Sequence, residues 1–377
     1  MKKQNLLILS LLGYFTISAQ THAAPGNEIT VAQVAPFSGV QGATGNAVNA
    51  GAQLYFDYIN STGGIDGKKI VFIKHDDEYK PDQTVEGVKN MIEKNKPVLF
   101  INTIGTATTA ALMKSQVLKK GGVGLLGPAT GAKFVAEAEN IFPIRASYDD
   151  ESARLINHLA LANPKRFAVL YQNDAYGKDV LASIEAHLKR YPGIELVRSE
   201  PYETSSTSLS DAAANIAQAK PDAVVLAAVT KPAVSFVREF RKISRYTTLA
   251  AMSPVDPEIV TKQLNPDEYS GMLFGSAYPH PANNREPIVA EMHKIQKILA
   301  RKEASSPRYM EGFITAKTAV MAMRRASKPI TAETMTKALS GFNYESLGGA
   351  ITVNYGNGIK GLNYIDVGMI GKSQFLQ

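Results

Sequence analysis

The sequence predicts an α/β protein with two similar lobes, each a parallel sheet covered by helices on both faces. Three observations predict this fold class. Short apolar runs rich in β-branched residues alternate with longer amphipathic stretches, which is typical of parallel strands joined by helices. The alternation starts again after Asp150 and runs for a similar length. No low-complexity segment or long linker separates the two series, so we expect short crossings and a hinge between the lobes.

The N-terminus predicts export. Met1–Lys3 is positively charged, the run from Leu6 to Ile17 is apolar, and small residues follow up to Ala23. This order is typical of a cleaved signal peptide over residues 1–23. The apolar run is shorter than the roughly 20 residues that span a bilayer, and it lacks the amphipathic period of a buried helix. We therefore expect the protein in the periplasm.

The first series contains four expected strands, each ending in small or hydroxyl residues. Gly-rich or polar turns separate them from the helices that follow. The expected strands cover residues 29–37, 68–77, 97–105 and 123–129, and the expected helices cover residues 43–59, 84–94 and 108–119.

The second series contains five expected strands with helices between them, and the chain then becomes mainly helical. The first strand leads into a helix from about Lys178, and a short strand pair over residues 348–366 ends the chain. The expected strands cover residues 166–177, 193–202, 221–232, 247–254 and 271–279, and the late helices cover residues 287–302, 310–326 and 332–339.

The composition excludes several function classes. The chain has no cysteine, which excludes thiolate metal sites, cysteine nucleophiles and a lipid-modified cysteine. The formal charge is +7, and removal of Lys2 and Lys3 with the signal peptide leaves +5. The basic residues are scattered rather than gathered in a stripe with aromatic residues, so we expect no nucleic-acid partner.

The sequence also offers no catalytic or cofactor motif. Two segments match G-x-G-x-x-G, but residues 122–127 open an expected strand and residues 356–361 lie near the C-terminus between two strands. A dinucleotide site instead follows a strand and opens a helix. No Walker, H-E-x-x-H or G-x-S-x-G sequence occurs. We therefore expect no cofactor, no metal and no enzymatic activity.

Polar and aromatic residues follow the expected strands, where ligands of open α/β sheets bind. Thr108 and the residues after Thr130 stand where helices are expected to begin, and two helix N-termini facing one cleft would hold a carboxylate. Each residue alone also has a structural explanation, since Thr108 suits a helix start and Gly131 suits a turn. The candidate ligand-binding residues are Ser38, Tyr79, Thr106, Thr108, Ala129, Thr130, Tyr148, Tyr176, Thr230 and Ser253.

Several segments, in this order and spacing, resemble one family over the whole chain after residue 23. They include "NSTGGIDG", "GTATTAAL", "LLGPATGA", "RASYDDE", "YQNDAYGKD" and "YMEGFITAKTAVMAM". The sequence resembles the periplasmic solute-binding proteins of the branched-chain amino acid type, which deliver ligands to ABC transporters. The resemblance implies a type I periplasmic binding protein fold with three hinge crossings. It implies an N-terminal lobe of residues 24–146 plus 279–356 and a C-terminal lobe of residues 147–278 plus 357–377.

The resemblance also implies roles and partners. Thr108 matches the hydroxyl that holds the ligand α-carboxylate at a helix start. Ala129 matches the backbone carbonyl that meets the α-ammonium, and Tyr176 matches the tyrosine that closes on the ligand from the second lobe. The implied partners are a small-molecule ligand, an amino acid or related small carboxylate, and the membrane permease of an ABC transporter, and we expect a monomer.

Two departures from the family pattern concern the ligand. The family's amino acid binders carry threonine where this chain has Gly131, and an acid that pairs the ammonium where this chain has Ser253; the nearest acid along the chain is Asp256. A buried ammonium without a carboxylate would bind poorly. We therefore expect a small monocarboxylate, with an aromatic acid as one possibility, to bind better than branched-chain amino acids. A sensory binding protein for a membrane receptor and an exported hydrolase remain alternatives.

Overall fold

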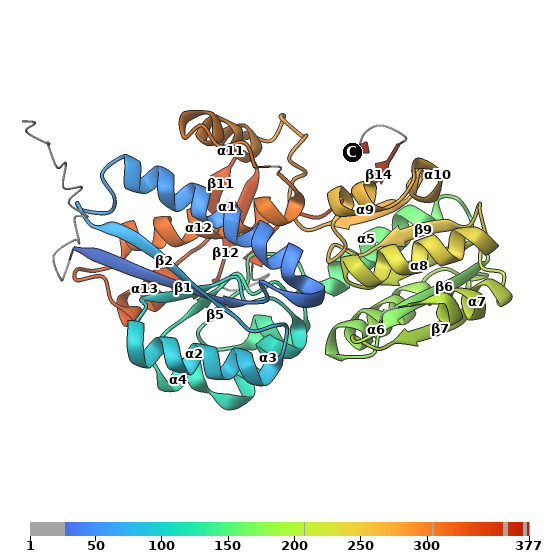
Figure 1. The fold of residues 1–377 in the computed structure, drawn as a ribbon, viewed down its shortest axis with the longest axis horizontal. Coiled ribbons are helices and arrows are strands. Elements are labelled where there is room, and N and C mark those ends of the chain that lie inside the picture. The colour runs from blue at the N-terminus through green and yellow to red at the C-terminus, as the bar shows by residue number, and fades with distance from the viewer. Residues whose placement is uncertain (1–26, 207, 304, 357–360, 372–374, 377) are drawn as a thin grey trace, which may run out of the picture.

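The computed structural model describes residues 27–206, 208–303, 305–356, 361–371 and 375–376, and shows two α/β lobes side by side with a small third sheet (Figure 1). The predicted signal peptide, residues 1–23, lies outside the described residues. No helix within the described ranges is long and apolar enough to cross a membrane. The two α/β lobes confirm the predicted fold class.

The first lobe contains a five-stranded sheet in the order β2-β1-β3-β4-β5, and all its strand pairs are parallel. Alternate residues of β1 face different cores: Val31 packs with one cluster, and Ala32 and Val34 with another. The sheet is thus covered on both faces. Its strands are β1 (Glu28–Ala35), β2 (Lys69–Asp76), β3 (Leu99–Ile101), β4 (Leu125–Leu126) and β5 (Ile141–Phe142), and its helical segments are η1 (Gly39–Gln41), α1 (Gly42–Ser61), α2 (Pro81–Asn95), α3 (Thr106–Ser115), α4 (Val117–Lys120) and η2 (Lys133–Glu137).

Two predictions for this lobe are wrong in detail. The helix expected over residues 108–119 begins at Thr106 and breaks at Gln116, whose φ of 56° is left-handed, so two helices stand in its place. The region after Thr130 forms the short 3-10 segment η2 rather than an α-helix. Of the two helix starts that the sequence predicted at the cleft, only the one near Thr108 belongs to an α-helix, α3.

The second lobe contains a seven-stranded sheet in the order β15-β14-β10-β9-β8-β6-β7. The five strands from β6 to β10 are parallel, whereas β14 and β15 add an antiparallel edge that the prediction lacked. The strands are β6 (Arg166–Gln172), β7 (Glu195–Tyr202), β8 (Ala223–Ala227), β9 (Thr248–Ala251), β10 (Leu273–Ser276), β14 (Asp366–Ile370) and β15 (Phe375–Leu376), and the helices are α5 (Tyr148–Ala160), α6 (Ala175–Leu188), α7 (Ser210–Gln218), α8 (Thr230–Ile243), α9 (Pro257–Gln263) and α10 (Pro266–Tyr269).

Side-chain caps begin α5 and α6, among other helices of this lobe. The Ser147 hydroxyl accepts a hydrogen bond from the Asp150 amide and opens α5, a helix that the sequence analysis missed. The Asp174 carboxylate accepts from the Gly177 amide and opens α6, three residues before the expected start near Lys178. These caps bring Tyr148 and Tyr176 into the first turns of two neighbouring helices.

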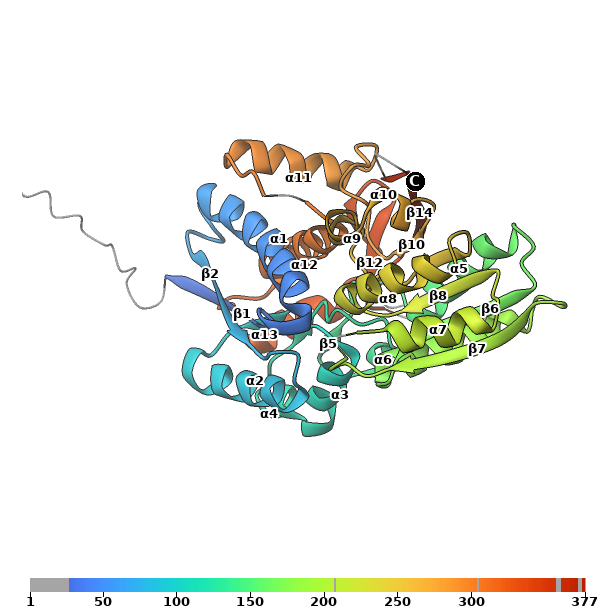
Figure 2. The same cartoon turned by 45° about the vertical axis from the view of Figure 1, so that its right-hand side comes forward.

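The chain returns to the first lobe after β10 and packs α12 directly on α1 (Figure 2). The backbones touch at two glycines: a Cβ on Gly51 would lie 1.9 Å from the Tyr309 carbonyl oxygen, and one on Gly312 would lie 1.8 Å from the Val48 carbonyl oxygen. This close packing fixes the start of α12. The returning elements are α11 (Pro287–Ile298), α12 (Pro307–Arg325), α13 (Ala332–Ser340), β11 (Glu345–Gly348), β12 (Ile351–Asn354) and β13 (Gly361–Leu362).

The strand pairings indicate where the chain crosses between the lobes. It leaves the first sheet after β5, leaves the second after β10, and enters the second again at β14. Leu362 in β13 packs in the core of the first lobe, whereas Asp366 begins a strand that pairs with β10. We therefore propose that the third crossing lies at residues 363–365 rather than after residue 356; the other boundaries, after residues 146 and 278, stay predictions.

Candidate functional site

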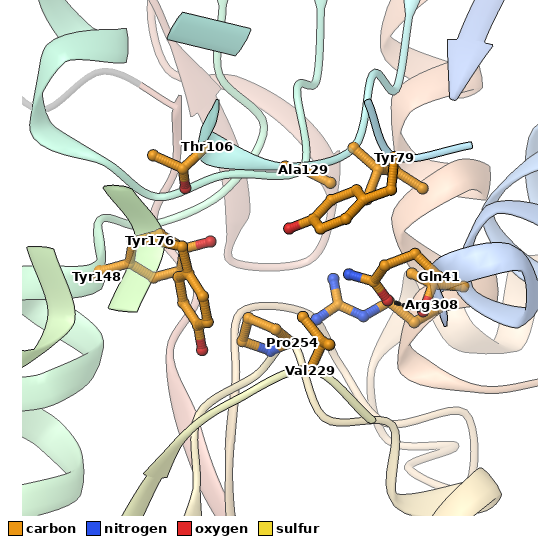
Figure 3. Close-up of a pocket in the computed structure, with 12 residues that line it drawn as sticks. Gln41, Tyr79, Thr106, Ala129, Tyr148, Tyr176, Val229, Pro254 and Arg308 are labelled. Carbon is orange, nitrogen blue, oxygen red and sulfur yellow. Dashed lines mark hydrogen bonds between the residues drawn. The ribbon is translucent and has the colours of Figure 1, made fainter. Parts of the chain in front are cut away.

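A small cavity lies between the lobes, bounded by the carboxyl ends of strands from both sheets (Figure 3). The lobes also touch beside it, where α3 contacts α6 and η1 contacts α8. Seven lining residues come from the first sheet and its helices, four from the second lobe, and one from α12. They are Gln41, Thr44, Tyr79, Ile104, Gly105, Thr106 and Ala129, then Tyr148, Tyr176, Val229 and Pro254, and finally Arg308.

The first-lobe wall is built from backbone and hydroxyl groups. Gly105 is the N-cap of α3, so the free amides of the first turn lie at the cavity. The Thr106 hydroxyl lies 2.7 Å from the Thr130 hydroxyl, which holds the start of α3 against the neighbouring loop. In that loop, the Ala129 amide donates to the Thr103 carbonyl at 2.7 Å. This wall presents donors and a positive helix end, which suit an anion.

Local packing explains why position 131 is a glycine. A Cβ there would lie 2.7 Å from the Tyr148 backbone nitrogen, and the Tyr148 amide donates to the Gly131 carbonyl at 2.8 Å. The first-lobe loop therefore meets the start of α5 at backbone distance. A threonine at position 131 would collide with this contact, so this departure from the family pattern is a packing requirement of the chain.

The second-lobe wall is largely aromatic and apolar. The Tyr148 and Tyr176 rings lie 5.1 Å apart between centroids and are tilted by 56°. Both are buried, and burial raises the pKa of each phenol above its ordinary value, so both stay neutral. Val229 and Pro254 complete the wall. It offers ring faces and apolar contacts to a ligand body.

Tyr79 connects the walls. It follows β2 in the first lobe, and its ring points into the cavity from the side of Ala129 (Figure 3). Burial raises its phenol pKa, while hydrogen bonds to Gln172 of the second lobe and to Gln41 act in the opposite direction. The Tyr79 side chain thus reaches across the cleft to the end of β6.

Two buried arginine–glutamate pairs lie beside the cavity. Arg145 Nη2 lies 2.8 Å from Glu151 Oε2, and Arg308 Nη1 lies 2.6 Å from Glu311 Oε2. Both pairs reach Ser253: Arg145 Nη2 donates to its hydroxyl at 2.7 Å, and Arg308 Nη2 donates to its carbonyl. The cluster therefore ties the first-lobe helix α12 to the loop after β9 in the second lobe.

The sequence predicted no acid near Ser253, and this prediction is wrong, because a glutamate lies beside it in the folded chain. Glu151 accepts hydrogen bonds from the Ser253 amide at 2.5 Å and from its hydroxyl at 2.8 Å. That carboxylate, however, is paired with Arg145 and does not line the cavity. Asp256 caps α9, and burial raises its pKa. The cavity lining contains no carboxylate.

Five of the ten predicted site residues line the cavity: Tyr79, Thr106, Ala129, Tyr148 and Tyr176. Their contact with a ligand stays a prediction.

The other five lie outside the lining. The Thr108 hydroxyl donates to the Ile104 and Gly105 carbonyls at 2.6 and 2.8 Å, because α3 begins two residues earlier than expected. Thr130 lies behind Thr106. The remaining three also lie outside the lining. Ser38 is exposed at the start of η1. The Thr230 hydroxyl donates to the Pro254 carbonyl and accepts from the Asp256 amide, and Ser253 contacts the two arginine–glutamate pairs.

Sequence reasoning missed seven lining residues. Ile104, Gly105, Val229 and Pro254 adjoin predicted residues at strand ends, whereas Gln41 and Thr44 lie at the start of α1. The prediction does not include Arg308, because it rests mainly on residues that follow strands. A usable signal existed: Arg308 stands in the first turn of a helix that Ser306 caps and Pro307 begins, where the dipole disfavours a cation. Among the described residues, no group of three or more His, Cys, Asp or Glu could hold a metal.

Comparison with known proteins places this geometry among binding proteins. The family model described as "Periplasmic binding protein" matches residues 28–361. A substrate-binding periplasmic protein from Ralstonia solanacearum is 34% identical, with a TM-score of 0.89 over 93% of this chain and 99% of that one. A branched chain amino acid ABC transporter protein from Thermus thermophilus with bound valine is 16% identical, with a TM-score of 0.79 over 93% and 94%, and shares the fold.

Among curated proteins, the chain is 31% identical to Leu/Ile/Val-binding protein homolog 3 of Brucella melitensis, over 49% of this chain and 50% of that protein. It is 30% identical to Leu/Ile/Val-binding protein BraC3 of Rhizobium johnstonii, over 48% of each. The chain spans about half the length of these curated relatives in the matched regions.

Proposed function

This chain belongs to the periplasmic binding protein family, and from that premise we propose that it binds a small organic carboxylate between its lobes and delivers it to the permease of an ABC-type uptake system. The related structures and curated proteins are ligand-binding proteins rather than enzymes. We propose the same for this chain.

The observation that carries the proposal is the cavity lining. One wall presents the start of α3 at Gly105 and the Thr106 hydroxyl, the other presents Tyr148 and Tyr176, and no lining residue is acidic. A carboxylate at the helix start would accept amide hydrogen bonds and meet the positive dipole end. Its apolar body would lie against the tyrosine rings.

Binding would act through lobe closure. Lining residues come from both lobes, so both walls contact the ligand only when the lobes are together. A ligand that binds only the closed form stabilises it by about 2.7 kcal/mol at a hundredfold excess over Kd. The closed form would then be the one that a permease recognises.

A thermal-shift panel followed by calorimetry tests the ligand class. The panel contains amino acids, their deaminated analogues, aromatic acids and matched amides without a charge. We expect at least one carboxylate to raise Tm and to bind one per chain, and its amide to bind at least tenfold more weakly, because a hydrogen bond to a charged group contributes about 1.5–3 kcal/mol. Equal binding of acid and amide would contradict a carboxylate site.

Uptake by cells that lack this chain separates transport from sensing. We expect uptake of the bound carboxylate to fall, and to recover when the chain is restored. Unchanged uptake with loss of a ligand-dependent response would favour the sensory alternative. Turnover of ester or amide substrates by the purified protein would favour a hydrolase.

A further inference from the structure

We propose that Arg308 determines ligand charge: its guanidinium binds an oxygen of an anionic ligand and rejects an α-ammonium group. This inference rests on the proposed function and narrows its ligand class. The sequence patterns pointed only to a missing acid, whereas the structure assigns the selection to a cation.

Arg308 lines the cavity and has one buried donor without a partner. Its side chain is 4% exposed, it lines the cavity, and its guanidinium lies beside Gln41, across from Tyr148 and Tyr176 (Figure 3). Two of its nitrogens are occupied, Nη1 by Glu311 and Nη2 by the Ser253 carbonyl. Nε has no hydrogen-bond partner. A buried N–H without a partner is costly, so an acceptor from the ligand would remove that cost.

The surroundings of Arg308 keep it in place. Glu311 is held on the far side by the Tyr278 hydroxyl at 3.0 Å, and the Ser253 carbonyl belongs to a loop that Glu151 also binds. The backbone contact between α1 and α12 fixes the helix itself. The guanidinium therefore cannot swing away to make room for a second cation without breaking these contacts.

This arrangement discriminates between ligands by charge. An ammonium in the cavity would lie near a guanidinium with no lining carboxylate to pair it, and would lose its water as well. An anionic or carbonyl oxygen would instead receive the free Nε–H in a charge-assisted hydrogen bond. Because Glu311 balances the Arg308 charge, the selection comes mainly from the unpartnered donor and the absence of a lining carboxylate that could pair an ammonium.

Two matched ligand pairs test the inference: leucine with 4-methylpentanoate, and phenylalanine with 3-phenylpropanoate. Each pair differs only in the α-ammonium group. We expect the wild-type protein to bind the deaminated member at least tenfold more tightly in at least one pair, as measured by calorimetry.

The variant Arg308→Met with Glu311→Gln removes both charges and keeps an acceptor for Tyr278. We expect its preference to fall to within about threefold, mainly through weaker binding of the deaminated acid. Arg308→Lys, which keeps the charge but lacks Nε, should still reject the amino acid and bind the acid about tenfold more weakly. Arg324→Met, an exposed position of the same helix, should behave as wild type.

The outcomes are distinct. If the double variant keeps the wild-type preference, the role of Arg308 is overturned. If that variant does not fold, Arg308→Lys replaces it as the test, and an unchanged preference and affinity in Arg308→Lys overturn the role equally. A wild-type preference for the amino acids overturns the charge selection but leaves the proposed solute-binding function standing. If no carboxylate of the wider panel binds, the proposed ligand class fails and this inference fails with it.

Discussion

The two buried arginine–glutamate pairs have the same composition and different surroundings. Arg145–Glu151 and Arg308–Glu311 are both nearly inaccessible to solvent, both meet Ser253, and each arginine has one nitrogen without a partner. Arg308 lines the cavity, whereas Arg145 lies behind it with its guanidinium 4.8 Å from the centre of the Tyr148 ring.

The difference teaches that burial and pairing alone do not identify a ligand contact. Both pairs bear the cost of removing charges from water, and each arginine is needed by its own glutamate. Only the pair whose arginine lines the cavity can also act on a ligand. We therefore expect Arg145 to affect stability and Arg308 to affect ligand choice.

The largest expected effect is on stability, from Arg145→Met. The change leaves Glu151 buried without its cation, and breaking a buried pair costs about 3–5 kcal/mol. Urea unfolding should show this loss, while the preference between 4-methylpentanoate and leucine should stay as in wild type. A lost preference with unchanged stability would reverse the roles that we assign to the two arginines.

Asp77 is a buried acid that, unlike Glu151 and Glu311, is hydrogen-bonded to neutral groups rather than paired with an arginine. It accepts hydrogen bonds from the Thr84 hydroxyl and the Tyr79 amide, and burial raises its pKa to about 6. The folded protein therefore binds the proton more tightly than the unfolded chain. This stabilisation is present below pH 4 and is lost as pH rises through 6.

The effect should be about 2–3 kcal/mol in the free energy of unfolding. The difference between wild type and Asp77→Asn, measured by urea unfolding from pH 4 to pH 7, isolates it from the other carboxyl groups. We expect the wild type to lose stability relative to the variant as pH rises. A constant difference across this range would contradict a raised pKa for Asp77.

Thr106 and Thr108 offer a second comparison between a residue that lines the cavity and one that does not, and Thr106→Val tests the first of them. Thr106 lines the cavity at the first residue of α3, so loss of its hydroxyl should weaken carboxylate binding about tenfold. Calorimetry with 4-methylpentanoate measures this. Affinity equal to that of wild type would remove Thr106 from the binding site.

Thr108→Val should give the smallest effect, and on stability instead. Its hydroxyl donates to the Ile104 and Gly105 carbonyls, so its loss should cost about 1 kcal/mol of unfolding free energy. Ligand affinity should change by less than threefold if the hydroxyl stays on the backbone. A tenfold loss of affinity would instead support the role that the family resemblance implies for Thr108.

The fold could be predicted because parallel strands leave a clear pattern. Strands such as β8 are apolar throughout, since both faces of the sheet are covered. The two-residue β5 and the antiparallel edge at β14 left no comparable pattern, because pairing rather than periodicity defines them. The helix α5 was missed although Ser147 and Asp150 form a cap that the sequence contains.

Most of the correctly predicted lining residues follow strands, and Tyr148 is the exception. Tyr79, Thr106 and Ala129 follow strands of one sheet, and the rule that ligands bind at those ends brought them together. Arg308 comes from a helix that packs on the first lobe after the second crossing. Its place at the cavity depends on the contact between α1 and α12, a long-range packing that no local pattern contains.

Closure of the lobes over a ligand is the central claim, and small-angle X-ray scattering tests it most directly. The radius of gyration is measured for ligand-free protein and for protein saturated with 4-methylpentanoate. We predict a smaller radius of gyration at saturation, and the same smaller value for Thr106→Val at a correspondingly higher ligand concentration. An unchanged radius of gyration, while calorimetry reports one ligand bound per chain, would contradict a site between the lobes that closes on its ligand.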